Sequence, residues 1–163
     1  MTFVPPYPGE FLNPYPLGTT ITLSTIVSTF AVTVKSATMD ANAEVEAVTD
    51  PHTGQPVNGP PPAGDQYTLV NLSLTSPADF GPSSVPELFG AALAEGADHV
   101  MYKPDSCVPP PLDLGSIGTV DAGQTVIGNL CFTIAPTDAS TLELGFTTVA
   151  FKGLDHPVWF ALR

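Results

Sequence analysis

Hydrophobic and polar residues alternate over several segments of this chain, and the longest such segment spans residues 121–136. A turn at residues 121–123 opens it and Pro136 closes it. One face of the segment carries Val126, Leu130, Phe132 and Ile134, and the other carries Thr125, Asn129, Cys131 and Thr133. This period of two predicts a long β-strand with one side on a hydrophobic core. In that register Cys131 points away from the core.

Shorter alternating runs predict further strands, at residues 19–27, 29–35, 66–74, 142–149 and 156–163. Residues 86–94 fit a helical turn by propensity or a strand by context. We favour a strand, because a turn at 95–98 and a run at 99–103 follow, as in a hairpin. Residues 39–65 and 104–118 are rich in Pro and Gly and are expected to be loops. About seven or eight strands without a convincing helix predict an all-β, antiparallel β-sandwich.

Residues 1–16 interleave five prolines with the aromatic residues Phe3, Tyr7, Phe11 and Tyr15. Because proline fixes φ and lacks a backbone donor, the segment is expected to be an extended or polyproline-like arm rather than a helix. Aromatic rings favour docking over full exposure, so three outcomes stay open: packing on its own domain, docking on a neighbouring subunit, or disorder. The remaining residues, 17–163, are expected to form one sandwich domain.

The charge balance excludes several classes of partner. The chain has 163 residues, with four Lys and Arg against sixteen Asp and Glu, a formal net charge of −12. Nucleic-acid binding and attachment to anionic lipids both need clustered basic residues, and this chain has none. No apolar run approaches the roughly 20 residues of a membrane span. We therefore expect a protein without nucleic-acid partners or membrane insertion, kept soluble by its acidity.

The two cysteines, Cys107 and Cys131, lack the spacing of a metal-binding pair, so a disulfide is predicted, with two unrelated free thiols as the alternative. Such a bond persists in an oxidising compartment outside the cytosol. Residues 1–6 lack the features of a secretory signal, so either a leader has been removed or export is not used. With Cys131 on the outer face of its strand, the bond would fasten the loop of Pro109, Pro110 and Pro111 over the exterior of the sheet.

The order of elements resembles the telokin-like immunoglobulin-fold domain of secreted mycobacterial antigens and related actinobacterial lipoproteins. The resemblance covers about residues 19–162 and rests on the segments 30–34, 67–74, 122–132, 142–144 and 158–160. It implies an immunoglobulin-like sandwich and an exported binding or structural module, without catalytic residues to carry over. In the usual immunoglobulin domain the disulfide crosses the core, whereas the register here places Cys131 outside it.

Candidate chemistry is sparse, and no cofactor is expected. Ser116 lies in a Gly-Ser-Ile-Gly sequence that lacks the spacing of a nucleophile elbow, so we predict a protein that is not an enzyme. His99 and Met101 are separated by one residue and would share a strand face, a weak indication of a copper site. Ordinary surface side chains are the alternative interpretation of these two residues.

Trp159 is the only tryptophan, and alternation places it outward while Val158 and Phe160 point inward. Together with the arm it is the predicted contact surface, unless the arm simply covers it within one chain. Three functions follow: an exported or surface-associated module acting through protein contacts, a virion or assembly subunit whose arm clasps a neighbour, and a copper-binding module. The corresponding locations are the extracellular space or cell envelope for the first, and the virion for the second.

Overall fold

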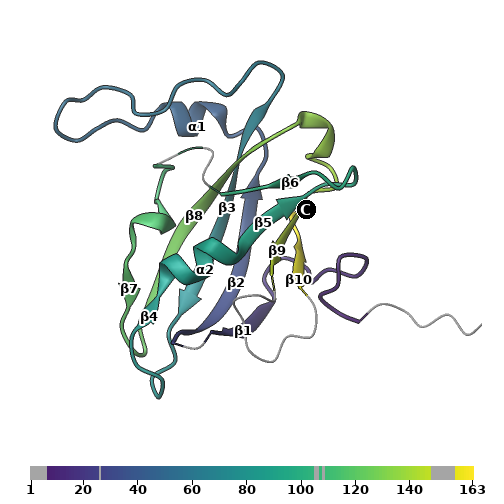
Figure 1. Cartoon of the computed structure of the whole chain (residues 1–163). Coiled ribbons are helices and arrows are strands. Elements are labelled where there is room, and N and C mark those ends of the chain that lie inside the picture. The colour runs from purple at the N-terminus through teal and green to yellow at the C-terminus, as the bar shows by residue number, and fades with distance from the viewer. Residues whose placement is uncertain (1–6, 26, 105–106, 108, 148–156) are drawn as a thin grey trace, which may run out of the picture.

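The computed structural model describes residues 7–25, 27–104, 107, 109–147 and 157–163 and is a sandwich of two four-stranded antiparallel sheets (Figure 1). The first sheet has the order β1-β2-β3-β8. Its strands are β1 (Thr20–Ser24), β2 (Thr29–Thr38), β3 (Gln66–Thr75) and β8 (Thr125–Ile134). Pairing between β3 and β8 is continuous from Gln66–Ile134 to Thr75–Thr125. The alternating segments of the sequence therefore form the long strands of this sheet.

The second sheet has the order β10-β9-β5-β6 and consists of shorter strands. These are β5 (Ala92–Glu95), β6 (Met101–Tyr102), β9 (Glu143–Phe146) and β10 (Val158–Ala161). A separate two-stranded pair, β4 (Ser83–Ser84) with β7 (Thr119–Val120), completes the strands. The all-β sandwich is confirmed, and the described residues form ten strands, of which the two-residue strands β4 and β7 were not expected.

The core lies between the two sheets and is built from the apolar faces that the alternation predicts. The first sheet contributes residues such as Val32, Leu72, Leu130 and Phe132, and the second contributes Leu144, Phe146 and Phe160. The Phe146 and Phe160 rings meet edge to face, with centroids 6.2 Å apart. Burial of these side chains is the main driving force for the two sheets to stack.

Two short helices occur where strands or loops were expected, so these predictions were wrong. Helix α2 (Val85–Ala91) precedes β5, and buries Val85, Leu88 and Ala91 at a spacing of three. Pro86 suits its first turn because the missing N–H has no partner there in any helix. Helix α1 (Asn42–Glu46) lies inside the predicted loop 39–65 and buries Val45. The hairpin of β5 and β6 does form, with Ala94 opposite Tyr102. Two 3₁₀ turns follow, at Leu114–Ser116 and Pro136–Asp138.

The outer face of the first sheet carries a second, smaller hydrophobic cluster around the disulfide. Cys107 and Cys131 are bonded, with Cα atoms 5.7 Å apart. Cys131 faces away from the main core, as its register predicts, but it is fully buried rather than open to solvent. The cluster consists of Ala41, Val45, Tyr67, Leu69, Cys107 and Cys131. Helix α1 and Cys107 therefore cover this part of the sheet.

Side-chain amides hold the proline loop over the same face. Asn129 donates from Nδ2 to the Pro111 carbonyl at 2.7 Å, and Asn58 donates from Nδ2 to the Pro109 carbonyl at 2.8 Å. The Asn129 backbone N–H also donates to the Leu112 carbonyl. These bonds satisfy buried polar groups and fix the loop of residues 109–112 against β8. The loop thus lies where the outward register of Cys131 places it.

Candidate functional site

Residues 7–16 of the predicted arm form turns rather than an extended chain, so the extended prediction was wrong for this part. The Gly9 N–H donates to the Asn13 carbonyl at 2.8 Å, and the Asn13 N–H donates to the Glu10 carbonyl at 2.8 Å. Gly9 has φ +87°, and a Cβ at this position would overlap the Tyr15 ring. Only glycine adopts this conformation readily, and it reverses the chain where proline patterning alone indicated an extended course.

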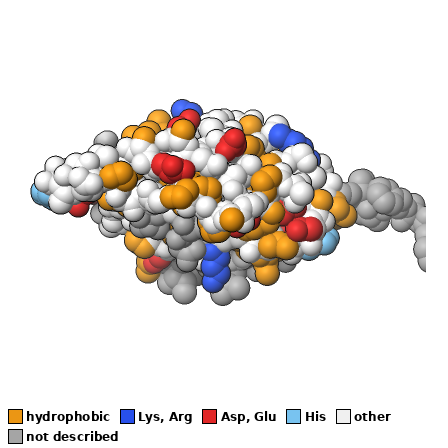
Figure 2. All heavy atoms as spheres, turned by 90° about the horizontal axis from the view of Figure 1, so that it is seen from above, with side chains coloured by type: hydrophobic (Ala, Val, Ile, Leu, Met, Phe, Trp, Pro, Cys, Tyr) orange, Lys and Arg blue, Asp and Glu red, His pale blue; other side chains and the backbone are white. Residues whose placement is uncertain are grey.

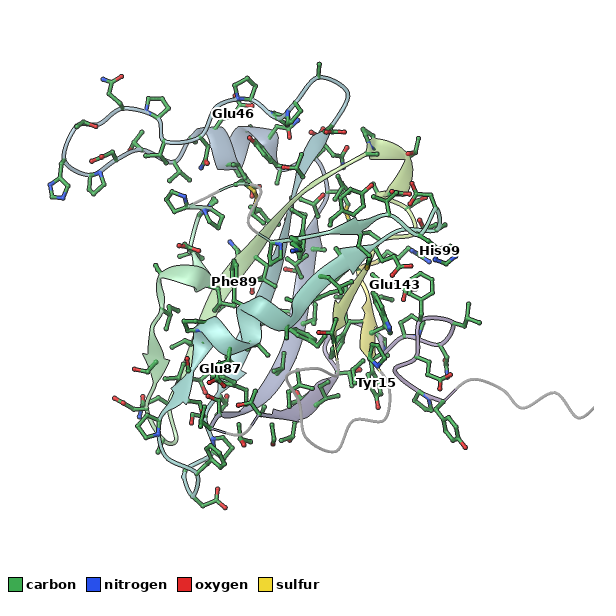
Figure 3. The ribbon with its side chains drawn as sticks, in the orientation of Figure 1. Tyr15, Glu46, Glu87, Phe89, His99 and Glu143 are labelled. Carbon is green, nitrogen blue, oxygen red and sulfur yellow. A yellow bond between two sulfur atoms is a disulfide. The ribbon has the colours of Figure 1, made fainter. Side chains whose placement is uncertain are left out.

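The same segment packs on its own domain, along the edge of β10. The Trp159 N–H donates to the Gly9 carbonyl at 2.7 Å, the Tyr15 N–H to the Trp159 carbonyl at 2.9 Å, and the Ala161 N–H to the Tyr15 carbonyl at 2.9 Å. Tyr15 and Phe160 form a parallel bridge, and Tyr15 lies beside this edge in Figure 3. An edge strand that would otherwise expose backbone donors and acceptors is therefore covered within one chain.

Trp159 lies on the predicted outward face but under this segment, which agrees with the alternative that the arm covers it within one chain. Its side chain points away from the core residues Val158 and Phe160, but the residue is only 8% exposed. The Phe11 ring meets it edge to face at 5.0 Å. A Cβ on Gly145 would lie 2.6 Å from the Trp159 ring, so the ring rests directly over this glycine.

The four aromatic residues of the arm consequently have different positions. Phe11 and Tyr15 pack on Trp159 and Phe160 respectively, whereas Tyr7 is 66% exposed. Phe3 lies outside the described residues. Phe11 and Trp159 cover one another, so the structure does not bring them together as an open interaction surface.

The possible copper ligands His99 and Met101 do not share a strand face, which corrects that expectation. His99 lies in the turn before β6, with φ +62°, and its Nδ1 is 2.7 Å from Oε1 of Glu95. Met101 is exposed in β6. Within the described part of the chain, no group of three or more His, Cys, Asp or Glu side chains could hold a metal ion, and no helix could span a membrane.

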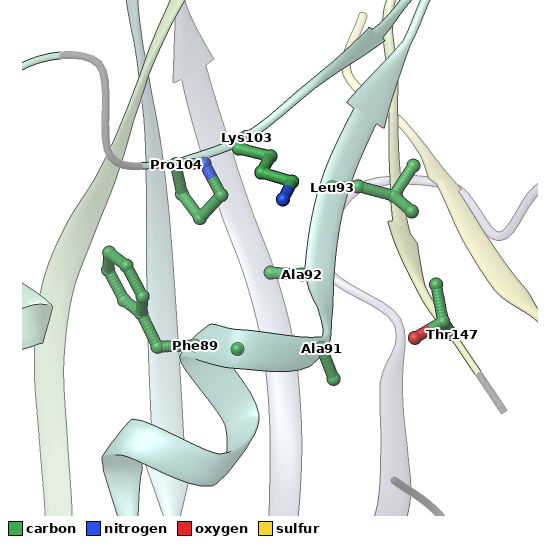
Figure 4. A pocket seen from close by; sticks show the side chains of 8 residues that line it. Phe89, Ala91, Ala92, Leu93, Lys103, Pro104 and Thr147 are labelled. Carbon is green, nitrogen blue, oxygen red and sulfur yellow. The ribbon is translucent and has the colours of Figure 1, made fainter. Parts of the chain in front are cut away.

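Two adjoining cavities form a groove beside α2, which sequence reasoning missed. Its first cavity has a volume of about 360 Å³ and is shown in Figure 4. Phe89 forms one wall, and Pro104 and Lys103 lie on the β6 side. The cavity is lined by Phe89, Gly90, Ala91, Ala92, Leu93, Lys103, Pro104 and Thr147. Its walls combine apolar side chains such as Phe89 and Pro104 with polar groups, among them Lys103 and Thr147.

A second cavity of about 310 Å³ continues the groove along α2 toward the loop that contains Pro110. It shares Phe89, Gly90 and Pro104 with the first cavity. Its other lining residues are Pro86, Pro110, Asp113 and Gly115. The sequence signal for α2 is the spacing of three between the apolar residues Val85, Leu88 and Ala91. A helix that buries these three residues places Phe89 and Gly90 on its open side.

Charge around the groove is unevenly distributed. Lys103 lines the first cavity and Asp113 the second, while the chain as a whole carries sixteen acids against four bases. On the face in Figure 2, the Lys and Arg side chains lie apart from one another.

Next to the groove, Tyr102 donates to Asp138 Oδ2 at 2.5 Å, and burial together with this bond raises the pKa of Tyr102 to about 12. Tyr102 therefore stays neutral and holds β6 in place.

One buried acid stands apart from the groove, at the start of β9. Glu143 is 7% exposed, and its Oε2 has no hydrogen-bond partner. Burial raises the pKa of Glu143 to about 7, with a smaller raising effect from Glu95 and an opposing effect from Arg163. Figure 3 shows Glu143 on the arm side of the molecule, away from Phe89 on α2. A perturbed, unpaired carboxyl of this kind marks a possible functional position.

Several solved structures share the architecture of this chain at low sequence identity. MPT63, a secreted protein of Mycobacterium tuberculosis, has a TM-score of 0.57 and 14% identity, covering 91% of this chain and 97% of its own. An uncharacterized β-sandwich protein of Clostridium difficile has a TM-score of 0.56 and 12% identity, covering 93% and 95%. The yjhA protein of Bacillus subtilis has a TM-score of 0.54 and 11% identity, covering 91% and 99%. These similarities show the fold.

Comparison with protein-family models and with curated protein sequences gives no match. The fold neighbours include a secreted mycobacterial protein, in keeping with the sequence resemblance, and membership of the telokin-like family stays a prediction. None of the three is described as an enzyme. The chain is therefore a β-sandwich protein similar in fold to secreted and uncharacterized bacterial sandwich proteins.

Proposed function

We propose that this protein is an exported, extracellular binding module that acts through the groove beside α2 and not through catalysis. The observation that carries the proposal is the pair of adjoining cavities that share Phe89, Gly90 and Pro104. The occupant is an extended segment of a partner protein, because two neighbouring cavities accommodate successive apolar side chains of one chain. Phe89 supplies the large apolar contact of the kind that dominates binding energy.

Charge supports a basic partner rather than a second copy of this chain. With a formal charge of −12, two copies repel each other, whereas a segment with Lys or Arg beside its apolar residues is attracted. Asp113 at one end of the groove gives such a basic residue a local partner. We therefore expect the recognised segment to carry two or three apolar residues flanked by basic ones.

Two observations support an extracellular location. The Cys107–Cys131 disulfide is typical of proteins that work in oxidising compartments. The fold is also similar to that of a secreted mycobacterial protein. An alternative, assembly through an arm that clasps a neighbour, has less support, because residues 9–15 already occupy the edge of β10 in their own chain.

The proposal is tested by selecting phage-displayed peptides of about twelve residues on the protein and comparing their binding to two variants. Gly90→Leu places a side chain in both cavities, and a Cβ at Gly90 meets nothing within 4 Å, so the fold is retained. Gly118→Leu is the matched control, because its Cβ also enters open space but lies outside the groove.

Selected peptides should contain apolar residues next to Lys or Arg, and should lose at least about tenfold in affinity for Gly90→Leu, as expected when a central contact is blocked. Their affinity for Gly118→Leu should match that of the parent protein. Peptides that bind all three proteins equally, or a selection that yields acidic peptides, would contradict the proposal.

A further inference from the structure

A third cavity lies between the N-terminal segment and the outer face of the second sheet. Its volume is about 320 Å³, and none of its lining residues belongs to the groove beside α2. Phe11, Leu12 and Pro14 form an apolar roof from the N-terminal segment. The opposite wall comes from the sheet and its turns, through Ala97, Thr141, Glu143 and Arg163. The cavity therefore has an apolar side and a polar side.

Glu143 is the polar group at the base of this cavity. In the sheet register it lies opposite Ala161 on β10 and opposite Glu95 on β5. Its neighbour Leu144 belongs to the core, so the Glu143 side chain lies on the outer face, beneath the N-terminal segment. The residue is nine-tenths buried, and Oε2 has no partner. A buried carboxyl oxygen without a partner is unfavourable, and a donor in the cavity would relieve this.

The charged groups near the cavity favour a cation as that donor. Glu95, opposite Glu143, is held by His99, whose Nδ1 lies 2.7 Å from Oε1 of Glu95. Asp138 accepts from Tyr102 on the neighbouring hairpin. Arg163, which is exposed, also lines the cavity and opposes these acidic groups, since its charge lowers the pKa of Glu143 more than Glu95 raises it. The Phe11 ring lines the same cavity, and the face of an aromatic ring attracts cations.

We propose that this cavity binds the ammonium group of a small alkylamine, with the ammonium on the Glu143 carboxylate and the alkyl chain against Phe11, Leu12 and Pro14. Oε2 is buried, so the Glu143 side chain must turn toward the cavity for an ammonium, which donates up to three hydrogen bonds, to reach it. A charge-assisted bond of this kind is stronger than a neutral one. The inference is independent of the peptide groove, because the two sites share no residue.

Binding should become stronger as the pH rises. Glu143 must be ionised to pair with an ammonium, and its pKa in the free protein is raised to about 7. Below that pH the amine must displace a proton, and above it the carboxylate is already available.

The test is an NMR titration with n-butylammonium chloride near pH 8, followed at the indole N–H of Trp159 and the amides of Ala97 and Thr141. Trp159 is the only tryptophan, so its indole gives a single signal next to Phe11. Glu143→Gln keeps the size of the side chain and removes its charge. Glu44→Gln, an exposed acid on α1, makes the same change in net charge elsewhere.

Saturable shifts are expected in the parent protein and in Glu44→Gln, with at least about tenfold weaker binding in Glu143→Gln. Arg163→Gln should bind the amine more tightly, because a like charge has been removed. If Glu143→Gln fails to fold, the parent protein alone decides through the rise in affinity between about pH 6 and pH 8. Absence of shifts, equal binding by Glu143→Gln, or binding of butyrate that is lost in Arg163→Gln would overturn the proposal.

Discussion

Gly145 is the position at which one added methyl group tests how the N-terminal segment, Trp159 and the second sheet fit together. It lies in β9, paired with Leu93 on one side and Trp159 on the other. A Cβ built on Gly145 would lie 2.6 to 2.8 Å from three carbons of the Trp159 ring. Contacts this short do not occur, so Gly145→Ala must displace the ring or the strand. Displacement of the ring would disturb its edge contact with Phe11 at 5.0 Å.

Two opposing effects set the size of the change. Adding a methyl group to a filled site destabilises by about 1–3 kcal/mol. Replacing a strand glycine by alanine otherwise stabilises by roughly 0.5–1 kcal/mol, because glycine loses more backbone freedom on folding. The steric term is larger, so Gly145→Ala should lower the free energy of unfolding by about 1–2 kcal/mol. For a domain of this size, this corresponds to a fall of roughly 2–8 °C in Tm.

Urea unfolding followed by the fluorescence of Trp159 measures this change. Gly118→Ala is the control, because its Cβ meets nothing within 4 Å, and it should leave the stability unchanged or slightly raised. A double-mutant cycle with Trp159→Leu identifies the clash, since Gly145→Ala should cost little once the indole ring is absent. If Gly145→Ala is as stable as the parent, or costs the same in both backgrounds, the packing of Trp159 over Gly145 is refuted.

Three further predictions concern the disulfide, the buried acid and Tyr102. Reducing the Cys107–Cys131 bond should lower the free energy of unfolding by about 3.5 kcal/mol, the chain-entropy value for a loop of about 25 residues. Urea unfolding with and without reductant measures this, and two free thiols in the mass spectrum of natively prepared protein would disprove the bond. Burial raises the pKa of Glu143 from 4.5 to about 7, so the folded state binds this proton more tightly than the unfolded state. Stability should therefore fall as the pH rises from 4.5 to about 7 and then level off. Thermal unfolding of Glu143→Gln should depend less on pH over this range. An identical pH profile in both proteins would contradict the raised pKa of Glu143. Tyr102→Phe removes the donor to the buried Asp138 carboxylate and should lower the free energy of unfolding by about 1–3 kcal/mol, measured by thermal unfolding. The control, Tyr7→Phe at an exposed position, should leave this free energy unchanged. Equal effects of the two substitutions would argue against the buried bond.

The strands were predictable because alternation of apolar and polar residues is a local property. The strand over residues 121–136 appears as β8, with Leu130, Phe132 and Ile134 in the core and Cys131 on the opposite face. The hairpin of β5 and β6 was predictable from the turn between its strands. Helix α2 was not, because seven residues with Pro86 near one end and Gly90 and Ala91 at the other fit either a helix or a strand. A helix this short draws its stability mainly from burial of one face.

The candidate sites were less predictable, because each depends on which segments meet. The groove requires α2 next to Pro104 and Pro110, and the amine cavity requires the N-terminal segment over β9. The local signals at these positions are weak: Gly90 is one glycine among fourteen, and Glu143 one carboxyl among sixteen. Neither residue type indicates an open cavity until its neighbours are known.

The sequence by itself determined where the strands lie, which residues share a face, the acidic charge and the availability of one cysteine pair. These properties depend on residues close together in the chain or on composition alone. Tertiary structure decided which outward residues are covered. Cys131 lies beneath α1 and Cys107, Trp159 beneath Phe11, and Glu143 beneath the N-terminal segment. Periodicity gives the direction of a side chain, whereas its burial depends on what packs over it, and here that covering comes from segments far away in the sequence.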